Sequence, residues 1–211
     1  MLKIHHLVLS RSERIVWLAE ELGLPYELVR HERDPATFRA PASLKTYSPM
    51  VKFPAIQDGD LCLAESGAII EYLLTRYGNG RLRPAPDSKD YPTYLHWMHA
   101  AESTLMVPIL FELLGAMTQC SAPAMDGFID GEYDTVFGYL NEILSRQDYV
   151  AGNSFSAADI MVVYSLQLAN GSAIPMMKSK QDFTRFPAIG AYLARVEQRP
   201  ALAKARKLCA P

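Results

Sequence analysis

Short apolar runs alternate with helically spaced segments over the first 77 residues. Apolar residues dominate 2–9 and recur in 26–30, which predicts two short strands. Between them, apolar residues from Ile15 to Leu22 return every three or four positions, and this spacing predicts a helix that ends at Gly23. A strand, a helix and a second strand in this order favour a parallel pair of strands.

A second group of elements follows a less regular segment. Residues 53–57 and 61–64 flank Asp58-Gly59, a strong signal for a tight turn between antiparallel strands. From Ser66 the apolar positions take helical spacing again. The order β-α-β and then β-β-α predicts an α/β unit built on a mixed four-stranded sheet.

The chain changes character near residue 80. Residues 79–90 are rich in glycine, proline and charged residues, which is typical of a linker. From residue 91 to 211 the pattern is helical throughout. We therefore predict one domain over 1–78, a linker over 79–90 and an all-helical domain over 91–211.

Three apolar stripes predict helices in the second domain. The first is one long helix kinked at Pro108, and the last follows Phe186-Pro187 as one further helix. Apolar residues of the first two stripes are Tyr94, Trp97, Met98, Ala101, Leu105, Ile109, and then Phe128, Tyr133, Val136, Phe137 and Leu140. The last helix would turn Ile189, Leu193 and Val196 inward.

A helix start is marked by Ser156-Ala-Ala-Asp159. The serine would cap the first amides and the carboxylate would reach back, as in a capping box with Asp in place of Glu. Residues 160–168 are apolar on nearly all faces, so this helix is expected to be buried at the centre of its domain. Asp159 is therefore interpreted as a structural residue.

Composition narrows the class of protein. The chain has 211 residues, 49% hydrophobic and 21% charged, with a net charge of −2, which gives no electrostatic case for nucleic-acid binding. No apolar run is long enough to span a membrane, and no signal peptide is evident. Three widely spaced cysteines suggest neither a disulfide framework nor a zinc cluster, so a cytoplasmic location is expected.

Four motifs occur in order along the chain. They are Ser10-x-Ser-x-Arg14 after the first strand, SPMVKFP at 48–54, LAESGAI at 63–69 and NSFSAAD at 153–159. Together with the two-part layout over the whole chain, they resemble the glutathione transferases. Residues 95–106 are most similar to a bacterial and fungal branch. The resemblance implies a thioredoxin-like first domain, an all-helical second domain and glutathione as co-substrate.

The resemblance also implies how glutathione would bind. Pro54 would be in the cis form, leaving the main chain of Phe53 open to pair with the cysteinyl residue of the ligand as an added strand. Ser66 and the helix start would hold the γ-glutamyl carboxylate, and Glu65 its ammonium group. Lys52 would reach the carboxylate at the other end, with a solvated surface lysine as the alternative, and Arg11 would lie over the ligand.

The chemistry concerns the glutathione thiol. Only ~3% of a free thiol is ionised at pH 7, and a hydroxyl that donates a hydrogen bond would stabilise the thiolate. No tyrosine or cysteine occurs in the first 25 residues, so the resemblance is to the serine type of the family and not to its tyrosine or mixed-disulfide types, and it implies a serine as the catalytic group. Ser10 matches the family's serine position best. Ser12 is the alternative, although helix N-cap is the preferred interpretation for it.

The second substrate would lie between the domains. Aromatic and methionine side chains suit planar electrophiles, although a core position is an alternative for most of them. The predicted residues are Tyr94, His99, Met106, Phe111 and Tyr164. His96 and His99 share a helix face, but no third ligand stands out, so no metal site is expected.

The sequence thus predicts a detoxification enzyme that conjugates glutathione to small hydrophobic electrophiles. A glutathione-dependent peroxidase or disulfide reductase, and a non-enzymatic glutathione-binding scaffold, are the alternatives. The resemblance implies a homodimer, with the apolar pair Met50-Val51 buried against the partner.

Overall fold

The structure is a computed structural model that describes residues 1–120, 122–173 and 181–210. The chain divides into two compact units. The first comprises Met1–Leu82 with Glu197–Pro211, and the second comprises Arg83–Val196. No helix among the described residues is both long and apolar enough to cross a lipid bilayer.

The first unit is built on a four-stranded sheet in the order β2-β1-β3-β4. Strands β1 and β2 are parallel, whereas β3 runs antiparallel to both β1 and β4. This arrangement confirms the predicted mixed sheet. The strands span β1 Leu2–Leu7, β2 Tyr26–His31, β3 Ala55–Asp58 and β4 Leu61–Ala64, and a short 3₁₀ helix, η1, spans Ala42–Thr46.

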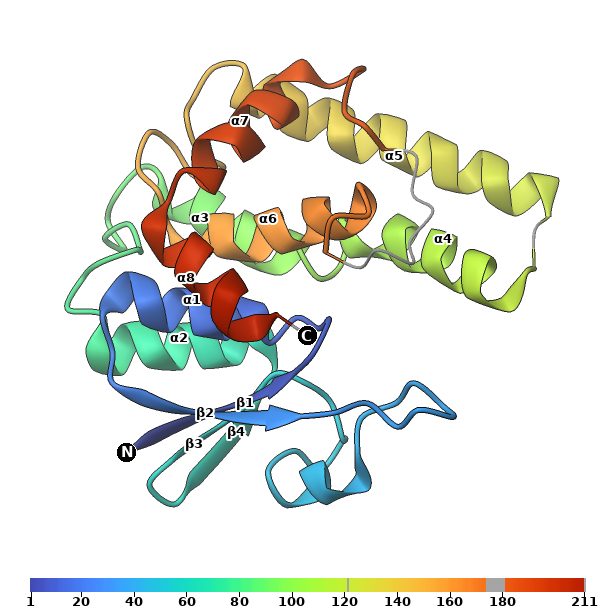
Figure 1. The fold of residues 1–211 in the computed structure, drawn as a ribbon. Coiled ribbons are helices and arrows are strands. Elements are labelled where there is room, and N and C mark those ends of the chain that lie inside the picture. Colours follow the sequence, from blue (N-terminus) through green and yellow to red (C-terminus); the bar gives the residue numbers. More distant parts are fainter. Residues whose placement is uncertain (121, 174–180, 211) are drawn as a thin grey trace. The chain divides into compact units, whose positions relative to one another are not determined.

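Helices α1 (Glu13–Leu22) and α2 (Ser66–Tyr77) cover one face of this sheet (Figure 1). The predicted end of α1 is confirmed, because Gly23 adopts a left-handed φ of 63° that glycine accepts without steric cost. The tight turn after Asp58 is also confirmed, with Gly59 at φ 61°. These two turns fix where the chain returns to the sheet.

The C-terminal helix α8 (Pro200–Cys209) packs against α1 in the same unit (Figure 1). The sequence did not predict this helix, because the pattern indicated only one helix after residue 186. Arg199 makes two hydrogen bonds to the carboxylate of Glu21, at 2.6 and 2.7 Å, and Lys204 lies 2.7 Å from Glu20. These contacts bring the end of the chain beside the first helix.

The second unit is entirely helical in its described residues. Its elements are α3 Tyr91–Ala100, α4 Met106–Thr118, α5 Pro123–Leu144, α6 Ala157–Ala169 and α7 Pro187–Glu197. Residues Ile189, Leu193 and Val196 of α7 are buried, as the sequence predicted. Helix α6 is buried along its whole length, which confirms the central helix.

Two predictions for the second unit are wrong. The long helix kinked at Pro108 is two helices, α3 and α4, separated by a turn over 101–105. Pro108 is the third residue of α4, where the helix does not use the backbone N–H that proline lacks, so it favours a helix start and not a kink. Phe128 is 48% exposed, so this first residue of the second stripe is not buried as Tyr133 and Phe137 are.

Asp159 lies at the centre of the second unit. The predicted capping box is present: the backbone N–H and the hydroxyl of Ser156 both donate to Asp159, at 2.8 and 3.0 Å. The carboxylate also accepts hydrogen bonds from the Val150 N–H at 3.0 Å and the Tyr192 hydroxyl at 2.9 Å. Burial raises the pKa of Asp159 to about 6, and these hydrogen bonds oppose the rise.

We expect Asp159→Ala to lower the free energy of unfolding by about 3 kcal/mol, because four buried donors lose their acceptor. Tyr192→Phe is the matched control: it removes one of the four hydrogen bonds and should cost about 1 kcal/mol. Urea-unfolding curves at neutral pH measure both. Equal losses in the two variants would contradict the structural role assigned to Asp159.

Candidate functional site

The connection between β1 and α1 carries both predicted catalytic serines. Ser12 is fully buried at the N-cap position of α1, yet its hydroxyl makes no capping hydrogen bond, so the preferred N-cap role is wrong for the side chain. The hydroxyl oxygen lies 2.8 Å from Nδ1 of His6 and accepts a hydrogen bond from the Leu7 N–H at 3.1 Å. Ser12 therefore ties the start of the helix to the end of the strand.

Ser10 is only half-buried and lies directly on this buried group. Its Oγ is 2.6 Å from Oγ of Ser12, and it accepts a hydrogen bond from the Ser12 N–H at 3.3 Å. Because the hydroxyl and the backbone N–H of Ser12 both contact Oγ of Ser10, the orientation of the Ser10 side chain is defined. Arg11, between the two serines, is also half-buried.

His6 completes the group, although no motif in the sequence pointed to it. Its imidazole is 1% exposed, and Nε2 lies 3.3 Å from the carbonyl oxygen of Cys209, at the end of α8. Burial lowers the pKa of His6 to about 4, so the ring is neutral near pH 7. The contact joins residues 203 positions apart, and no local pattern signals it.

Phe53 and Pro54 lie just before β3. The Phe53–Pro54 peptide bond is cis, as predicted. Phe53 is outside the ladder of β3, and within the described part of the chain neither its N–H nor its carbonyl has a hydrogen-bond partner. Pro54 is buried and Lys52 is exposed. The main chain of Phe53 is therefore available to a ligand.

Glu65 and Ser66 mark the start of α2, as predicted. Glu65 is exposed and has a positive φ of 79°, a conformation that costs of order 1–3 kcal/mol for a residue other than glycine. Ser66 is 3% exposed, and its hydroxyl makes no hydrogen bond to any described residue. Unpaired amides at a helix start and a free hydroxyl together favour an anion.

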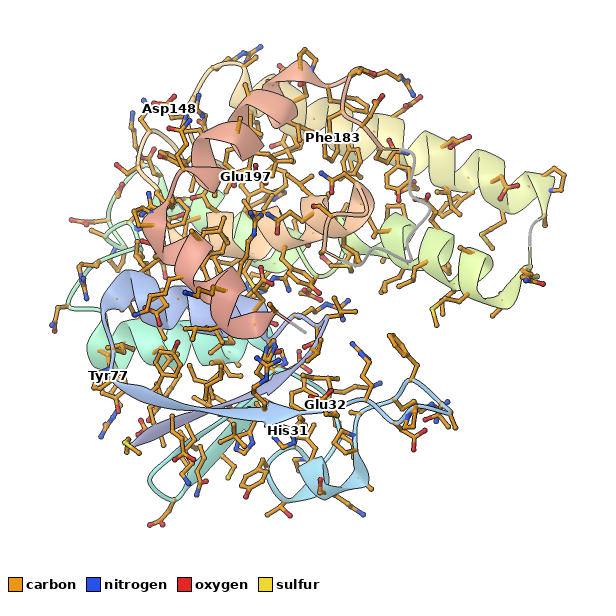
Figure 2. The ribbon with its side chains drawn as sticks, viewed as in Figure 1. His31, Glu32, Tyr77, Asp148, Phe183 and Glu197 are labelled. Atoms are coloured by element: carbon orange, nitrogen blue, oxygen red, sulfur yellow. The ribbon has the colours of Figure 1, made fainter. Side chains whose placement is uncertain are left out.

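An aromatic cluster lies next to Phe53. His5 stacks on Tyr47 with ring centroids 4.0 Å apart, and its Nδ1 is 2.9 Å from Nε2 of His31. His31 lies at the end of β2 (Figure 2). The centroid of its ring is 5.2 Å from that of Phe53. Burial, the nearby charge of His31 and that of Lys3 lower the pKa of His5 to about 4.

The residues predicted to contact the second substrate have different surroundings within the helical unit. Tyr94, Met106 and Tyr164 are buried, whereas His99 and Phe111 are exposed. The ring of Phe111 meets that of Phe128 edge-on, with centroids 6.3 Å apart. Among the residues that the structure describes, no three His, Cys, Asp or Glu side chains are grouped as metal ligands would be.

Two segments of the chain match domains of one known protein family. The Glutathione S-transferase N-terminal domain matches residues 2–75, and the Glutathione S-transferase C-terminal domain matches residues 116–207. A glutathione S-transferase-like protein of Beauveria bassiana is 30% identical over 198 residues, which cover 90% of this chain and 87% of that protein.

The chain belongs to the glutathione S-transferase family.

Other family members give the same result. Glutathione S-transferase 3 of Schizosaccharomyces pombe is 29% identical over 95% of this chain and 85% of its own length. A crystal structure of a glutathione S-transferase from Actinobacillus pleuropneumoniae is 31% identical, covers 99% of this chain and 93% of its own, and has a TM-score of 0.85. The resemblance inferred from the four motifs is confirmed, as is the two-part fold.

We expect the buried His5 to make the folded state sensitive to acid. Its pKa is about 4 in the folded chain and 6.5 in an unfolded one, so the unfolded state binds the proton first as the pH falls. The contribution of His5 to the free energy of unfolding should therefore be fully present above pH 6.5 and decrease between pH 6.5 and 4. His5→Phe, which keeps an aromatic ring beside Tyr47, should flatten this decrease.

His96→Phe is the matched control, because His96 lies on the exposed face of α3. Urea-unfolding curves at a series of pH values measure the slope in the wild type and both variants. An unchanged slope in His5→Phe, or a flattened one in His96→Phe, would show that the acid sensitivity has another source.

Proposed function

We propose that this family member binds glutathione in its first unit and activates the thiol as a thiolate that attacks small hydrophobic electrophiles. The half-buried Ser10 hydroxyl carries this proposal. It is fixed by Ser12 at the start of α1, where the helix dipole also favours a negative charge. A hydrogen bond to a charged acceptor is worth about 1.5–3 kcal/mol, or about one to two pKa units of the thiol.

Ser10, and not Ser12, is the residue we assign to the thiol. The hydroxyl of Ser12 is fully buried and already contacts His6, Leu7 and Ser10. A ligand would have to break these contacts to reach it. Ser10 has an exposed side, and its removal leaves the contacts of Ser12 with β1 in place.

The rest of the tripeptide would lie along the open main chain of Phe53. Its cysteinyl residue would pair there as an added strand, and its γ-glutamyl carboxylate would meet the start of α2 at Ser66, with Glu65 near the ammonium group. Lys52 is exposed and would serve the carboxylate at the other end. Arg11 would add positive potential. Solved relatives from a sphingomonad and from Phanerochaete chrysosporium contain glutathione and oxidized glutathione, respectively.

We expect Ser10→Ala to retain glutathione affinity and to lower kcat/KM for an aryl halide by about 10- to 100-fold, because the thiolate loses its hydrogen bond. The pKa of the bound thiol should rise by about one to two units, measured by ultraviolet titration of the thiolate. Ser66→Ala is the contrasting variant: its main effect should be weaker binding of glutathione. Full activity in Ser10→Ala would refute the assignment.

The exposed Phe111 and His99 are the residues we propose for contact with the electrophile. The buried Tyr94, Met106 and Tyr164 would shape that surface from within the helical unit. An assay with an aryl halide, an organic hydroperoxide and a glutathione-accepting disulfide separates the reaction types. Turnover of the aryl halide supports conjugation, whereas turnover of only the hydroperoxide or disulfide would replace it with redox activity.

We also propose that the protein is a homodimer in which Met50 contacts the partner. Met50 is 59% exposed on the loop before β3, and the adjacent Val51 has a positive φ of 54°. Burial of a methionine side chain is worth about 1.5–3 kcal/mol. Met50→Glu should therefore weaken the dimer about 10-fold or more in sedimentation equilibrium. Unchanged association would contradict this contact.

A further inference from the structure

The contacts around Ser12 favour one order of hydrogen-bond protons in the free protein. The carbonyl of Cys209 only accepts, so Nε2 of the neutral His6 carries the proton and donates to it. Nδ1 then has a lone pair and accepts from the hydroxyl of Ser12 at 2.8 Å. The carbonyl of Leu7, 3.3 Å from Oγ of Ser12, is a second acceptor for this hydroxyl, and we assign the proton to the shorter contact with Nδ1. Because Ser12 uses its single hydroxyl proton on this buried side, Ser10 donates in the 2.6 Å contact between the two serines.

This order conflicts with the role proposed for Ser10. To stabilise a thiolate, Ser10 must turn its proton toward the ligand. The short contact to Ser12 then needs the Ser12 proton, and Nδ1 of His6 loses its donor. All of these contacts are satisfied again only if Nδ1 of His6 carries a proton and donates to Ser12.

We propose that His6 is a positioning residue that takes up a proton, through Ser12 and Ser10, when the bound thiol ionises. The inference rests on the proposed function. The S–H bond breaks and an O–H bond forms on Ser10. The former Ser10 proton moves to Ser12, and the former Ser12 proton moves to Nδ1 of His6. Thiolate and imidazolium are formed together, with no proton lost or gained overall.

The end of α8 supports the imidazolium. Arg30 donates to the carbonyls of Leu208 and Ala210, at 2.7 and 2.6 Å, on either side of Cys209. These two hydrogen bonds hold the last turn so that the carbonyl of Cys209 remains at Nε2 of His6. That carbonyl accepts from the Nε2–H of both the neutral and the protonated ring, and it favours the protonated form. His6 therefore changes its proton only on the side that faces Ser12.

The surroundings of His6 keep it neutral until a thiolate forms. Burial is the main cause of its low pKa, the carbonyl of Cys209 opposes it, and the charges of Arg30 and His31 on β2 add to it. On α1, the carboxyl of Glu13 follows Ser12, and burial raises the pKa of Glu13. A thiolate adds a negative charge at the far end of the chain of hydroxyls. For the proton to stay on His6 at neutral pH, this charge must raise the pKa of His6 by about three units from its value of about 4.

The test is a pH titration of ¹⁵N-histidine-labelled wild-type protein by NMR. One sample is saturated with glutathione and the other with S-methylglutathione, which has no ionisable thiol. We expect His6 to carry its proton on Nε2 in the S-methylglutathione complex at neutral pH. In the glutathione complex its protonation midpoint should be about three units higher, so that the ring carries both protons at neutral pH where the thiolate is present. Equal midpoints would overturn the proposal.

Ser12→Ala separates the relay from simple charge attraction. This variant keeps Ser10 and His6 but removes the hydroxyl between them, so at least half of the difference between the two midpoints should be lost. A difference that persists in full would overturn the relay. The wild-type comparison needs no substitution, so it decides the question even if Ser12→Ala does not fold.

Ultraviolet absorbance of the thiolate, recorded on the same samples, distinguishes this inference from the proposed function. A thiolate signal with equal His6 midpoints overturns the relay alone. Absence of a thiolate signal in the saturated glutathione complex overturns the proposed function as well.

Discussion

The candidate site depends on one buried hydroxyl. Ser12 joins the last residues of β1 to the first turn of α1, and it fixes Ser10 on its exposed side and His6 on its buried side. Hydrogen bonds are electrostatically stronger in the protein interior than in water, and the members of a hydrogen-bonded network orient one another. The position of Ser10 is therefore set by the junction of strand and helix and not by the loop alone.

The other groups of the candidate site also lie at the ends of strands and helices. The groups open to a ligand lie where regular structure begins or ends: the main chain of Phe53 just before β3, and the hydroxyl of Ser66 at the first turn of α2. Backbone groups at such places lack partners within the element. Glu65, at the N-cap of α2, has an unfavourable positive φ. Backbone strain of this kind is found most often at functional sites.

Much of this arrangement was predictable because local rules produce it. Spacing predicted the sheet and its helices, Gly23 and the Asp58 turn marked their ends, and Ser156 with Asp159 marked α6. The sequence did not predict the break between α3 and α4, where Pro108 fits either a kink or a helix start. Nor did it predict the role of His6, because the carbonyl it contacts is at the opposite end of the chain.

The central claim is that glutathione lies along the main chain of Phe53 with its sulfur at Ser10. A crystal structure of the wild-type protein with glutathione tests it most directly. The account predicts the sulfur within hydrogen-bond distance of Oγ of Ser10, the cysteinyl main chain paired with Phe53 and the γ-glutamyl carboxylate at Ser66. Glutathione bound elsewhere, or with its sulfur held by a group other than Ser10, would contradict it.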